Sequence, residues 1–328
     1  MSKISVIGAG AWGTAFANHM AQMGMPVMLW VREDDVCRQI ESERVNRTFL
    51  PGIRLDDGIG STTDLDNALA NVEYVFWAVP AQHLRDVAQC AKPPANAIHI
   101  VMAKGIERNT WRFPFQILEE ILAVENIIVL SGPSFAEEVA QGKPTVLVAA
   151  SKSLNNARRI QHLISGAALR AYHSDDPLGV SLGGAYKNII AIATGISDGL
   201  GFGHNARAAL ITRGLSELVR LGEMLGARRE TLFGAAGVGD MILTCTSKIS
   251  RNYSLGNRIG QGEKFGDIVD SMIHVAEGAY STFGALHFAQ STDTELPIAI
   301  EVHEILWSGK DPLTGAKALM SRPLKSEW

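Results

Sequence analysis

One lysine is a clear candidate for acid and base chemistry. Lys187 lies in the otherwise apolar stretch G-G-A-Y-K-N-I-I-A-I (183–192), which has helical length and composition. Gly183 and Gly184 precede it by one turn on the same helical face, and we interpret them as a floor without side chains beside the ammonium. Burial would lower the pKa of such a lysine, whereas a neighbouring carboxylate would keep it charged. We predict that Lys187 exchanges a proton with a ligand, with a lysine reaching solvent from the helix edge as the alternative.

Two further segments carry groups that suit a proton relay or a phosphate. The glycine-rich stretch G-A-A-G-V-G-D ends in Asp240, which we expect near the lysine unless it is simply solvated. Ser250, Arg251 and Asn252 bring a hydroxyl, a guanidinium and an amide to the expected start of a helix. A helix amino end and an arginine fork both favour phosphate. We therefore interpret this start as a phosphate site, with plain N-capping by Ser250 as the alternative.

A glycine motif near the amino end predicts a dinucleotide site. Gly8, Gly10 and Gly13 stand in G-A-G-A-W-G, between an apolar run (4–7) and a helical stretch (14–23). In this setting the first glycine permits a tight turn and the second lets the backbone approach a pyrophosphate. The third lets the helix close on the strand, and the helix amino end then faces the negative charge.

The residue after the second strand should indicate which dinucleotide is bound. The apolar run 27–31 is followed by Arg32, Glu33 and Asp34. An arginine here can pair with a 2′-phosphate, whereas a carboxylate would accept hydrogen bonds from a free 2′-hydroxyl. We therefore favour NADPH over NADH, with a solvated arginine as the alternative interpretation.

Two more strand ends carry polar residues where ligands bind in such sheets. Lys104 follows the run 98–103 and is either a cation at the ligand crevice or a surface lysine. The run 127–130 is followed by S-G-P-S-F-A-E, in which Ser134 and Glu137 have the spacing of a capping box. Capping alone would explain both residues, yet a capped helix start also offers N–H groups to an anion or a cofactor.

A sheet must position the first group of these residues. Short β-rich runs alternate with helical segments up to about residue 175. The predicted strands are 4–7, 27–31, 74–79, 98–103, 127–130 and 145–149, with a further candidate at 169–173. Several runs are apolar at consecutive positions, which is typical of parallel strands covered on both faces. The connecting segments with helical spacing are 81–91, 113–124 and 153–164.

Long helices must position the second group. The helices expected beyond residue 176 are 178–197, 206–225, 251–261, 279–290 and 297–307. The fold class is therefore α/β, with a Rossmann-like, doubly wound, mostly parallel sheet and a second, mostly α-helical domain. We place the dinucleotide-binding domain at 1–176 and the helical substrate and catalytic domain at 177–328.

The composition excludes several other classes of protein. The chain of 328 residues is 46% hydrophobic and carries a formal charge of −4 without a basic block, so we expect no nucleic-acid partner. Cys37, Cys90 and Cys245 lack C-x-x-C spacing, which argues against a disulfide framework or a metal site and favours a reducing cytoplasm. No apolar run approaches the ~20 residues of a membrane helix, and the first strand begins too early to leave room for a signal peptide.

The motifs, taken in their order, resemble the NAD(P)-dependent glycerol-3-phosphate dehydrogenase family of the bacterial biosynthetic type. They are G-A-G-A-W-G (8–13), A-K-G (103–105), S-G-P-S-F-A (131–136), G-G-A-Y-K-N (183–188), G-V-G-D (237–240), S-R-N (250–252) and V-A-E-G (275–278). The resemblance covers essentially the whole chain. It implies an oxidoreductase that interconverts dihydroxyacetone phosphate and sn-glycerol 3-phosphate with NADPH or NADH, normally in the reductive direction that supplies glycerophospholipid synthesis.

The resemblance also implies roles for individual residues. Lys187 would be the catalytic acid and base. Substrate binding is implied for Lys104, Gly132, Ser134, Lys187, Asp240, Ser250, Arg251 and Asn252. Cofactor binding is implied for Gly8, Gly10, Ala11, Trp12, Gly13, Arg32, Lys104, Ala136, Arg251, Val275 and Glu277. Ala11 stands where many bacterial members have a serine, so backbone groups would have to serve the pyrophosphate there.

Two other functions stay open on the sequence alone. A dehydrogenase for a β-hydroxy acid or ketopantoate could use a lysine and an asparagine on one helix, but a carboxylate substrate does not require the Ser-Arg-Asn group. A non-catalytic NADP(H) sensor gives no reason for a lysine with glycines on its face. The sequence leaves the oligomeric state open, with a homodimer among the options.

Overall fold

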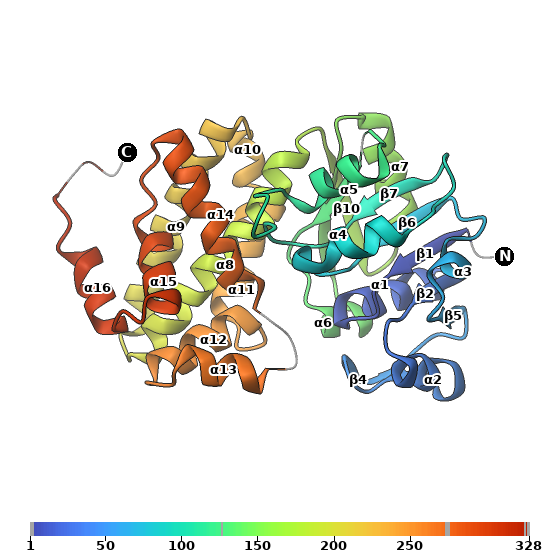
Figure 1. Cartoon of the computed structure of the whole chain (residues 1–328), viewed down its shortest axis with the longest axis horizontal. Helices are drawn as coiled ribbons and strands as arrows, with labels where there is room; N and C mark the ends of the chain where they lie inside the picture. The colour runs from blue at the N-terminus through green and yellow to red at the C-terminus, as the bar shows by residue number, and fades with distance from the viewer. Residues whose placement is uncertain (1–2, 126, 273–275, 325, 327–328) are drawn as a thin grey trace. The chain divides into compact units, whose positions relative to one another are not determined.

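The computed structural model describes residues 3–125, 127–272, 276–324 and 326. The chain divides into two compact units, which are coloured from blue to red along the chain in Figure 1. Unit 1 comprises Met1–Lys104 and Arg112–Ser181, and unit 2 comprises Gly105–Trp111 and Leu182–Trp328. Among the helices of the described residues, none is both long and apolar enough to cross a membrane.

Unit 1 is built on an eight-stranded sheet. The strands across it are β10 (Leu169–Ser174), β9 (Thr145–Ala150), β8 (Ile128–Ser131), β7 (Ile98–Val101), β6 (Tyr74–Trp77), β1 (Ile4–Ile7), β2 (Val27–Trp30) and β5 (Ile59–Thr62). All neighbours pair in parallel except β8 and β9, which are antiparallel. Every predicted strand is present, and the predicted mostly parallel α/β sheet is confirmed. β5 was missed because its sequence, I-G-S-T, has almost no apolar signal.

Helices cover both faces of this sheet. They are α1 (Ala11–Gln22), α2 (Asp34–Glu43), α3 (Leu65–Leu69), α4 (Ala81–Cys90), α5 (Pro114–Leu122), α6 (Ala136–Ala140) and α7 (Leu154–Ile164), with a hairpin of β3 (Val45–Asn46) and β4 (Leu50–Arg54) after α2. Phe16 of α1 and Ile160 of α7 share one core cluster with alternate strand residues such as Phe76. Val75 and Trp77, which point to the opposite face, are equally buried. α4 and α5 lie side by side (Figure 1).

In the described part of unit 2, all the secondary-structure elements are helical. Its elements are α8 (Pro177–Gly199), α9 (Gly203–Leu225), α10 (Arg229–Leu232), a π-helical turn η1 (Ala235–Gly239), α11 (Asp240–Thr246), α12 (Arg251–Gly260), α13 (Phe265–Ser271), α14 (Glu277–Thr292), α15 (Pro297–Trp307) and α16 (Pro312–Met320). The residues of α8 up to Ser181 group with unit 1. All the long helices predicted beyond residue 176 are present. The shorter α10, α11, α13 and α16 were missed because they span too few turns to show a period.

Two pairs of glycines let α8 and α12 meet at backbone contact. A Cβ atom on Gly195 would lie 2.1 Å from the carbonyl oxygen of Tyr253, and one on Gly256 would lie 2.1 Å from the carbonyl oxygen of Ile192. Gly199 and Gly260, each four residues further along the same helix, are similarly crowded. Residues four apart share a helix face, so each pair forms a smooth strip against the other helix. This contact holds the start of α12 beside α8.

A short segment of the chain between β7 and α5 packs on α14 of unit 2. Ile106 occupies the space above Gly284, where a Cβ would lie 2.4 Å from its Cγ2 atom. The Arg108 guanidinium lies 4.7 Å from the ring centre of Phe283, and Trp111 stacks on His287 at 5.0 Å. The chain that leaves unit 1 after Lys104 is therefore anchored on a rigid helix of unit 2.

The glycine contact predicts a selective loss of stability. Gly256→Ala should lower the free energy of unfolding by roughly 1–3 kcal/mol, because the new methyl group would press on a carbonyl oxygen that cannot move alone. In the matched variant Gly266→Ala, the new Cβ has open space among the residues that the structure describes, and the better helix propensity should raise stability by about 0.5–1 kcal/mol. Urea unfolding followed by circular dichroism measures both, and equal effects would contradict the packing described here.

Candidate active site

The glycine turn of unit 1 forms a cradle at the carboxyl end of β1. Gly8 has φ +111°, and a Cβ on Gly13 would lie 2.0 Å from the carbonyl oxygen of Gly8, so α1 closes tightly on the turn. By contrast, apart from Gly10 and its chain neighbours, no atom of the described residues lies within 4 Å of a Cβ on Gly10. Within the described residues, no side chain caps the amino end of α1. Open space beside exposed N–H groups fits a pyrophosphate, so these residues can hold a dinucleotide.

The turn lies where the strand order of the sheet reverses. β1 is flanked by β2 on one side and β6 on the other, and a Cβ on Gly8 would lie 3.0 Å from the carbonyl of Ala78, just after β6. Open α/β sheets bind ligands at this switch point, beyond the carboxyl ends of the strands.

Three predicted substrate residues meet at the same edge of the sheet. Lys104 follows β7, and its Nζ donates to the carbonyl oxygen of Gly132 at 3.0 Å. The Ser134 hydroxyl donates to the same oxygen at 3.0 Å. The structure therefore brings Lys104, Gly132 and Ser134 together after two parallel strands.

The alternative interpretation of Ser134 and Glu137, a simple capping box, is wrong. α6 begins at Ala136, with Phe135 as its N-cap, and the Ser134 hydroxyl donates backwards to Gly132 instead of accepting from the helix. Gly132 turns the chain at φ +147°, so the helix starts later than the motif requires. Ala136 packs with the small buried cluster that includes Ala15 of α1, and so it lies near the glycine turn.

Two of the predicted cofactor residues, Arg32 and Trp12, have side chains that are accessible to solvent. The Arg32 side chain is 73% exposed, and its Nη2 lies 2.7 Å from Oε1 of Glu33. Exposed ion pairs contribute only about 0–1 kcal/mol, so a bound phosphate could displace Glu33 at small cost. Trp12, in the first turn of α1, is half-buried, and its ring lies 6.0 Å from that of Phe16.

In unit 2, the Lys187 ammonium is buried between two side-chain oxygens that accept its hydrogen bonds. Its side chain is 9% exposed, and Nζ donates to Asp240 Oδ1 at 2.5 Å and to Thr244 Oγ1 at 2.9 Å. The alternatives of a lysine reaching solvent and of a solvated aspartate are therefore wrong. A buried carboxylate at this distance favours the protonated lysine, which makes the group an acid rather than a neutral amine.

Thr244 is a site residue that the sequence analysis missed. Its hydroxyl donates to the backbone carbonyl of Asp240 at 2.6 Å, which leaves an oxygen lone pair directed at Lys187. Asp240 and Thr244 are four residues apart and share one face of α11. The D-x-x-x-T spacing would have revealed the pair only if this short helix had been recognised.

The glycine floor predicted beside Lys187 is wrong for Gly183. A Cβ there would lie 2.6 Å from the carbonyl oxygen of Ala236 and 3.0 Å from Cα of Gly237. Gly183 therefore admits another stretch of backbone, the π-helical turn η1, and not a ligand. Because η1 runs straight into α11, this close contact is what brings Asp240 to the lysine.

The three residues that we predict to bind a phosphate lie at the amino end of α12. Ser250 is the N-cap and accepts from the backbone N–H of Tyr253 at 3.2 Å, while Asn252 Oδ1 accepts from the N–H of Gly278 at 3.0 Å. Arg251 keeps an exposed surface although it is crowded by protein; this crowding lowers the pKa of its guanidinium, and Glu277 opposes the change. Ser250 thus caps α12, and Asn252 links the start of α12 to the start of α14 on either side of the charged Arg251.

The structure also places Glu277 and Cys245, two further residues that the sequence analysis named. Glu277 is the first residue of α14, whereas Val275 lies outside the described residues. Cys245 is buried, which raises the pKa of its thiol to about 12 and makes it a packing residue. In the described part of the chain, no three His, Cys, Asp or Glu side chains gather as a metal site.

A second buried carboxylate supports the lysine helix. Glu217 of α9 accepts hydrogen bonds from the hydroxyl of Tyr186 at 2.6 Å and from the N–H of Ile298 at 2.7 Å, at the start of α15. Burial raises the pKa of Glu217 to about 7 and raises that of Tyr186 well above its ordinary value. Glu217 therefore joins α8, α9 and α15 at Tyr186, the residue that precedes Lys187.

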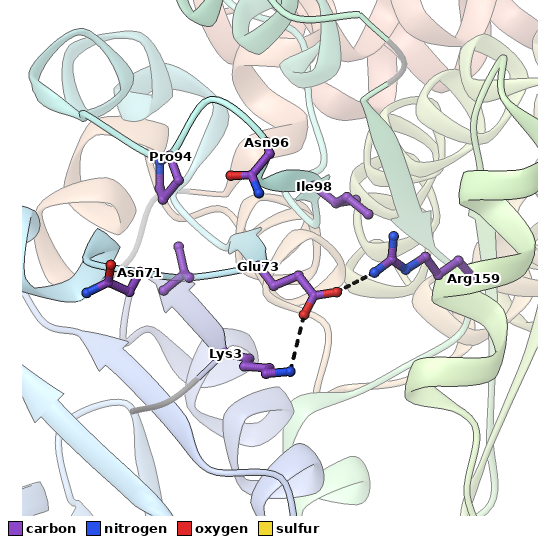
Figure 2. A pocket seen from close by; sticks show the side chains of 8 residues that line it. Lys3, Asn71, Glu73, Pro94, Asn96, Ile98 and Arg159 are labelled. Carbon is purple, nitrogen blue, oxygen red and sulfur yellow. Dashed lines mark hydrogen bonds and ion pairs between the residues drawn. The ribbon is translucent and has the colours of Figure 1, made fainter.

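A polar pocket of about 470 Å³ lies at the opposite edge of the sheet in unit 1. Figure 2 shows the Glu73 carboxylate between Lys3, 3.8 Å away, and Arg159. Glu73 directly precedes β6, so this pocket lies at the amino ends of the strands, away from the ligand-binding edge. We assign these ion pairs to the stability of unit 1.

The fold and these sites define a dinucleotide-binding dehydrogenase with a separate helical unit that carries a buried lysine. Family models for the amino-terminal and carboxyl-terminal parts of NAD-dependent glycerol-3-phosphate dehydrogenase match residues 3–157 and 176–317. The chain belongs to the NAD-dependent glycerol-3-phosphate dehydrogenase family. This membership confirms the resemblance drawn from the motifs, and with it an oxidoreductase that uses NAD or NADP.

Individual relatives match over nearly their full length. The glycerol-3-phosphate dehydrogenase (NAD(P)+) of Geobacter sp. strain M21 is 44% identical over 99% of this chain and 98% of its own. The glycerol-3-phosphate dehydrogenase (NAD(P)+) of Bacillus licheniformis is 42% identical over 98% of this chain and 95% of its own. The crystal structure of the Coxiella burnetii glycerol-3-phosphate dehydrogenase superposes with a TM-score of 0.93 at 37% identity, over 97% of this chain and 98% of that one. A ketopantoate reductase from Ralstonia eutropha shares only the fold, with 14% identity and a TM-score of 0.62.

The buried Glu217 predicts a pH-dependent stability. Its pKa near 7 exceeds the ordinary value of 4.5, so the folded chain keeps a proton that the unfolded chain releases between these two values. Its effect is therefore a loss of stability as pH rises through this window, by about 3 kcal/mol in total. In Glu217→Gln this loss should disappear, whereas the exposed variant Glu230→Gln should behave like the parent. Urea unfolding at several pH values between 4.5 and 7.5 measures how the free energy of unfolding changes with pH. The same pH dependence in the parent and in Glu217→Gln would contradict the raised pKa of Glu217.

Proposed function

We propose that the chain reduces dihydroxyacetone phosphate to sn-glycerol 3-phosphate with NAD(P)H, reversibly, and so supplies the glycerol phosphate backbone of phospholipids. The observation that carries this proposal is the buried Lys187 ammonium, held by Asp240 and Thr244. Relatives at 44% and 42% identity are named glycerol-3-phosphate dehydrogenases, which supports the substrate.

Lys187 is proposed as the catalytic acid. The reduced nicotinamide, when bound, supplies the hydride that adds to the carbonyl carbon of the ketone. Negative charge then grows on the carbonyl oxygen, where the Lys187 ammonium stabilises it and donates a proton to give the alcohol. Asp240 keeps the lysine protonated beforehand, and Thr244 fixes the direction of Nζ.

Arg251 is proposed as the main ligand of the substrate phosphate. The phosphate is remote from the reacting carbon, so its binding energy can orient the ketone as well as hold it. Ser250 and Asn252, which flank Arg251, are proposed to complete this site. Lys104, Gly132, Ser134 and Asp240 are the other proposed substrate contacts.

The glycine turn is proposed to bind the dinucleotide. Gly8, Gly10, Ala11, Trp12 and Gly13 would face the pyrophosphate, where the first N–H groups of α1 serve in place of a serine at position 11. The other proposed cofactor contacts are Arg32, Lys104, Ala136, Arg251, Val275 and Glu277. Arg32 favours NADPH because its guanidinium matches a 2′-phosphate.

The remaining parts of the proposal concern the setting of the enzyme. We propose residues 1–176 as the dinucleotide-binding domain and 177–328 as the catalytic domain. Cys37, Cys90 and Cys245 are unpaired, and Cys90 is exposed, which suits a reducing cytoplasm. A homodimer is the assembly to test first, by sedimentation.

The lysine site predicts the following kinetics. The parent chain should oxidise NADPH with dihydroxyacetone phosphate, and Lys187→Met should lower kcat by roughly 10²–10⁴-fold while still binding NADPH. Thr244→Val should lower kcat about tenfold through the loss of one hydrogen bond, whereas the exposed Thr246→Val should not. Absorbance of the reduced nicotinamide follows turnover, and fluorescence follows NADPH binding. Near-normal turnover in Lys187→Met, or faster turnover of ketopantoate by the parent, would refute the proposal.

Arg32 predicts the cofactor preference. Arg32→Ala should lower kcat/KM for NADPH by roughly 10–100-fold and leave that for NADH nearly unchanged, because a charge-assisted contact with the 2′-phosphate is lost. Arg38→Ala, an exposed arginine on α2, is the control. A preference that stays the same in Arg32→Ala removes this residue from the cofactor site.

A further inference from the structure

Unit 2 contains a second, mostly apolar pocket of about 580 Å³. It lies among α8, α9, α15, α16 and the chain after α16. Its apolar lining includes Ala193, Ile196, Leu200, Leu210, Val302 and Leu319. This volume is in the range of roughly 300–1,000 Å³ that small-molecule sites occupy, and none of the residues of the proposed catalytic site lines it.

The mouth of the pocket carries apolar side chains that are exposed to solvent. Phe202, Met320 and Leu324 all line it and are 43%, 87% and 102% exposed. A hydrocarbon chain lying against these side chains would remove their apolar surface from water, which is favourable. The pocket therefore favours a ligand with a long apolar part.

Among the charged residues of the lining, one arginine has neither a hydrogen bond nor an ion pair within the described residues. The two carboxylates are already engaged, since Glu217 holds the start of α15 and Glu301 lies 2.6 Å from Lys310. Two of the three arginines are hydrogen-bonded. Arg220 donates to the backbone carbonyl oxygen of Glu295 at 3.1 Å, and Arg322 donates to the Glu295 carboxylate at 2.8 Å.

Arg213 is the third arginine of this lining. The structure gives it no hydrogen bond or ion pair within the described residues, although its side chain is half-buried. Ser197 offers a second donor in the pocket: it is 4% exposed, and its hydroxyl has no partner among the described residues. A buried hydroxyl without a partner is unfavourable, so a ligand oxygen that accepts from Ser197 and pairs with Arg213 would stabilise both groups.

We propose that this pocket binds a single-chain amphiphile with an anionic head, such as a fatty carboxylate. The hydrocarbon chain lies along the apolar walls, the head pairs with the Arg213 guanidinium, and the Ser197 hydroxyl is available to a head-group oxygen. A second protein copy fits less well, because an apolar partner surface would bury the Arg213 charge without a counterion.

The test is a calorimetric titration of the full chain with decanoate below its micelle concentration. Decanoate should bind the parent, and Arg213→Gln should weaken it about tenfold while leaving binding of uncharged decanol unchanged. Ala209→Trp, which places a large ring in the pocket from an exposed lining position, should abolish binding of both. Arg229→Gln, a surface arginine outside the lining, should bind decanoate like the parent.

Several results would overturn this site. They are an absence of decanoate binding to the parent, equal weakening by Arg213→Gln and Arg229→Gln, or decanoate binding that survives Ala209→Trp. Circular dichroism of each variant checks that it is folded. A dimer that sediments as monomers only in Ala209→Trp, without decanoate binding to the parent, would assign the surface to a second copy and refute the proposal. The catalytic assay is independent of these readouts.

Discussion

The buried contact between Lys187 and Asp240 is the constraint on which unit 2 depends. Taking two charges out of water costs several kcal/mol each, and their attraction offsets this cost only when the geometry is good and the remaining hydrogen bonds are made. Thr244 makes one of these bonds, and it is itself held by the carbonyl of Asp240. The turn η1 and the helix α11 therefore serve to bring one carboxylate to one ammonium.

Glycines make that geometry rigid. Gly183 admits η1 against α8, and Gly195 and Gly256 admit the backbones of α8 and α12 to each other. A protein interior is packed as densely as an organic crystal, so helices in backbone contact have little freedom to shift. Lys187 on α8 and the start of α12, which we propose as the acid and the phosphate site, are consequently fixed relative to each other before any substrate arrives, which would lower the entropic cost of orienting it.

α8 connects the two ligand sites that we propose in unit 2. It carries Lys187 at one position and Ser197 about 15 Å further along its axis, by the rise of an α-helix. Glu217 of α9 also lines the pocket, and it bonds to Tyr186 of α8 and holds the start of α15. A ligand in the pocket would thus touch the helix that carries Lys187 and the carboxylate that bonds to its neighbour Tyr186.

The sequence by itself determined the strands of the sheet, the long helices and the glycine turn, because these depend on local periodicity and local turn chemistry. It also identified Lys187, Asp240 and Arg251 as residue types suited to the reaction. Only the tertiary structure decided that Gly183 faces backbone rather than ligand, that Ser134 does not cap a helix, and that Thr244 completes the lysine site. These outcomes depend on which atoms distant segments bring within 3 Å, and such distances are set by packing across the unit, which has no signature within a short stretch of sequence.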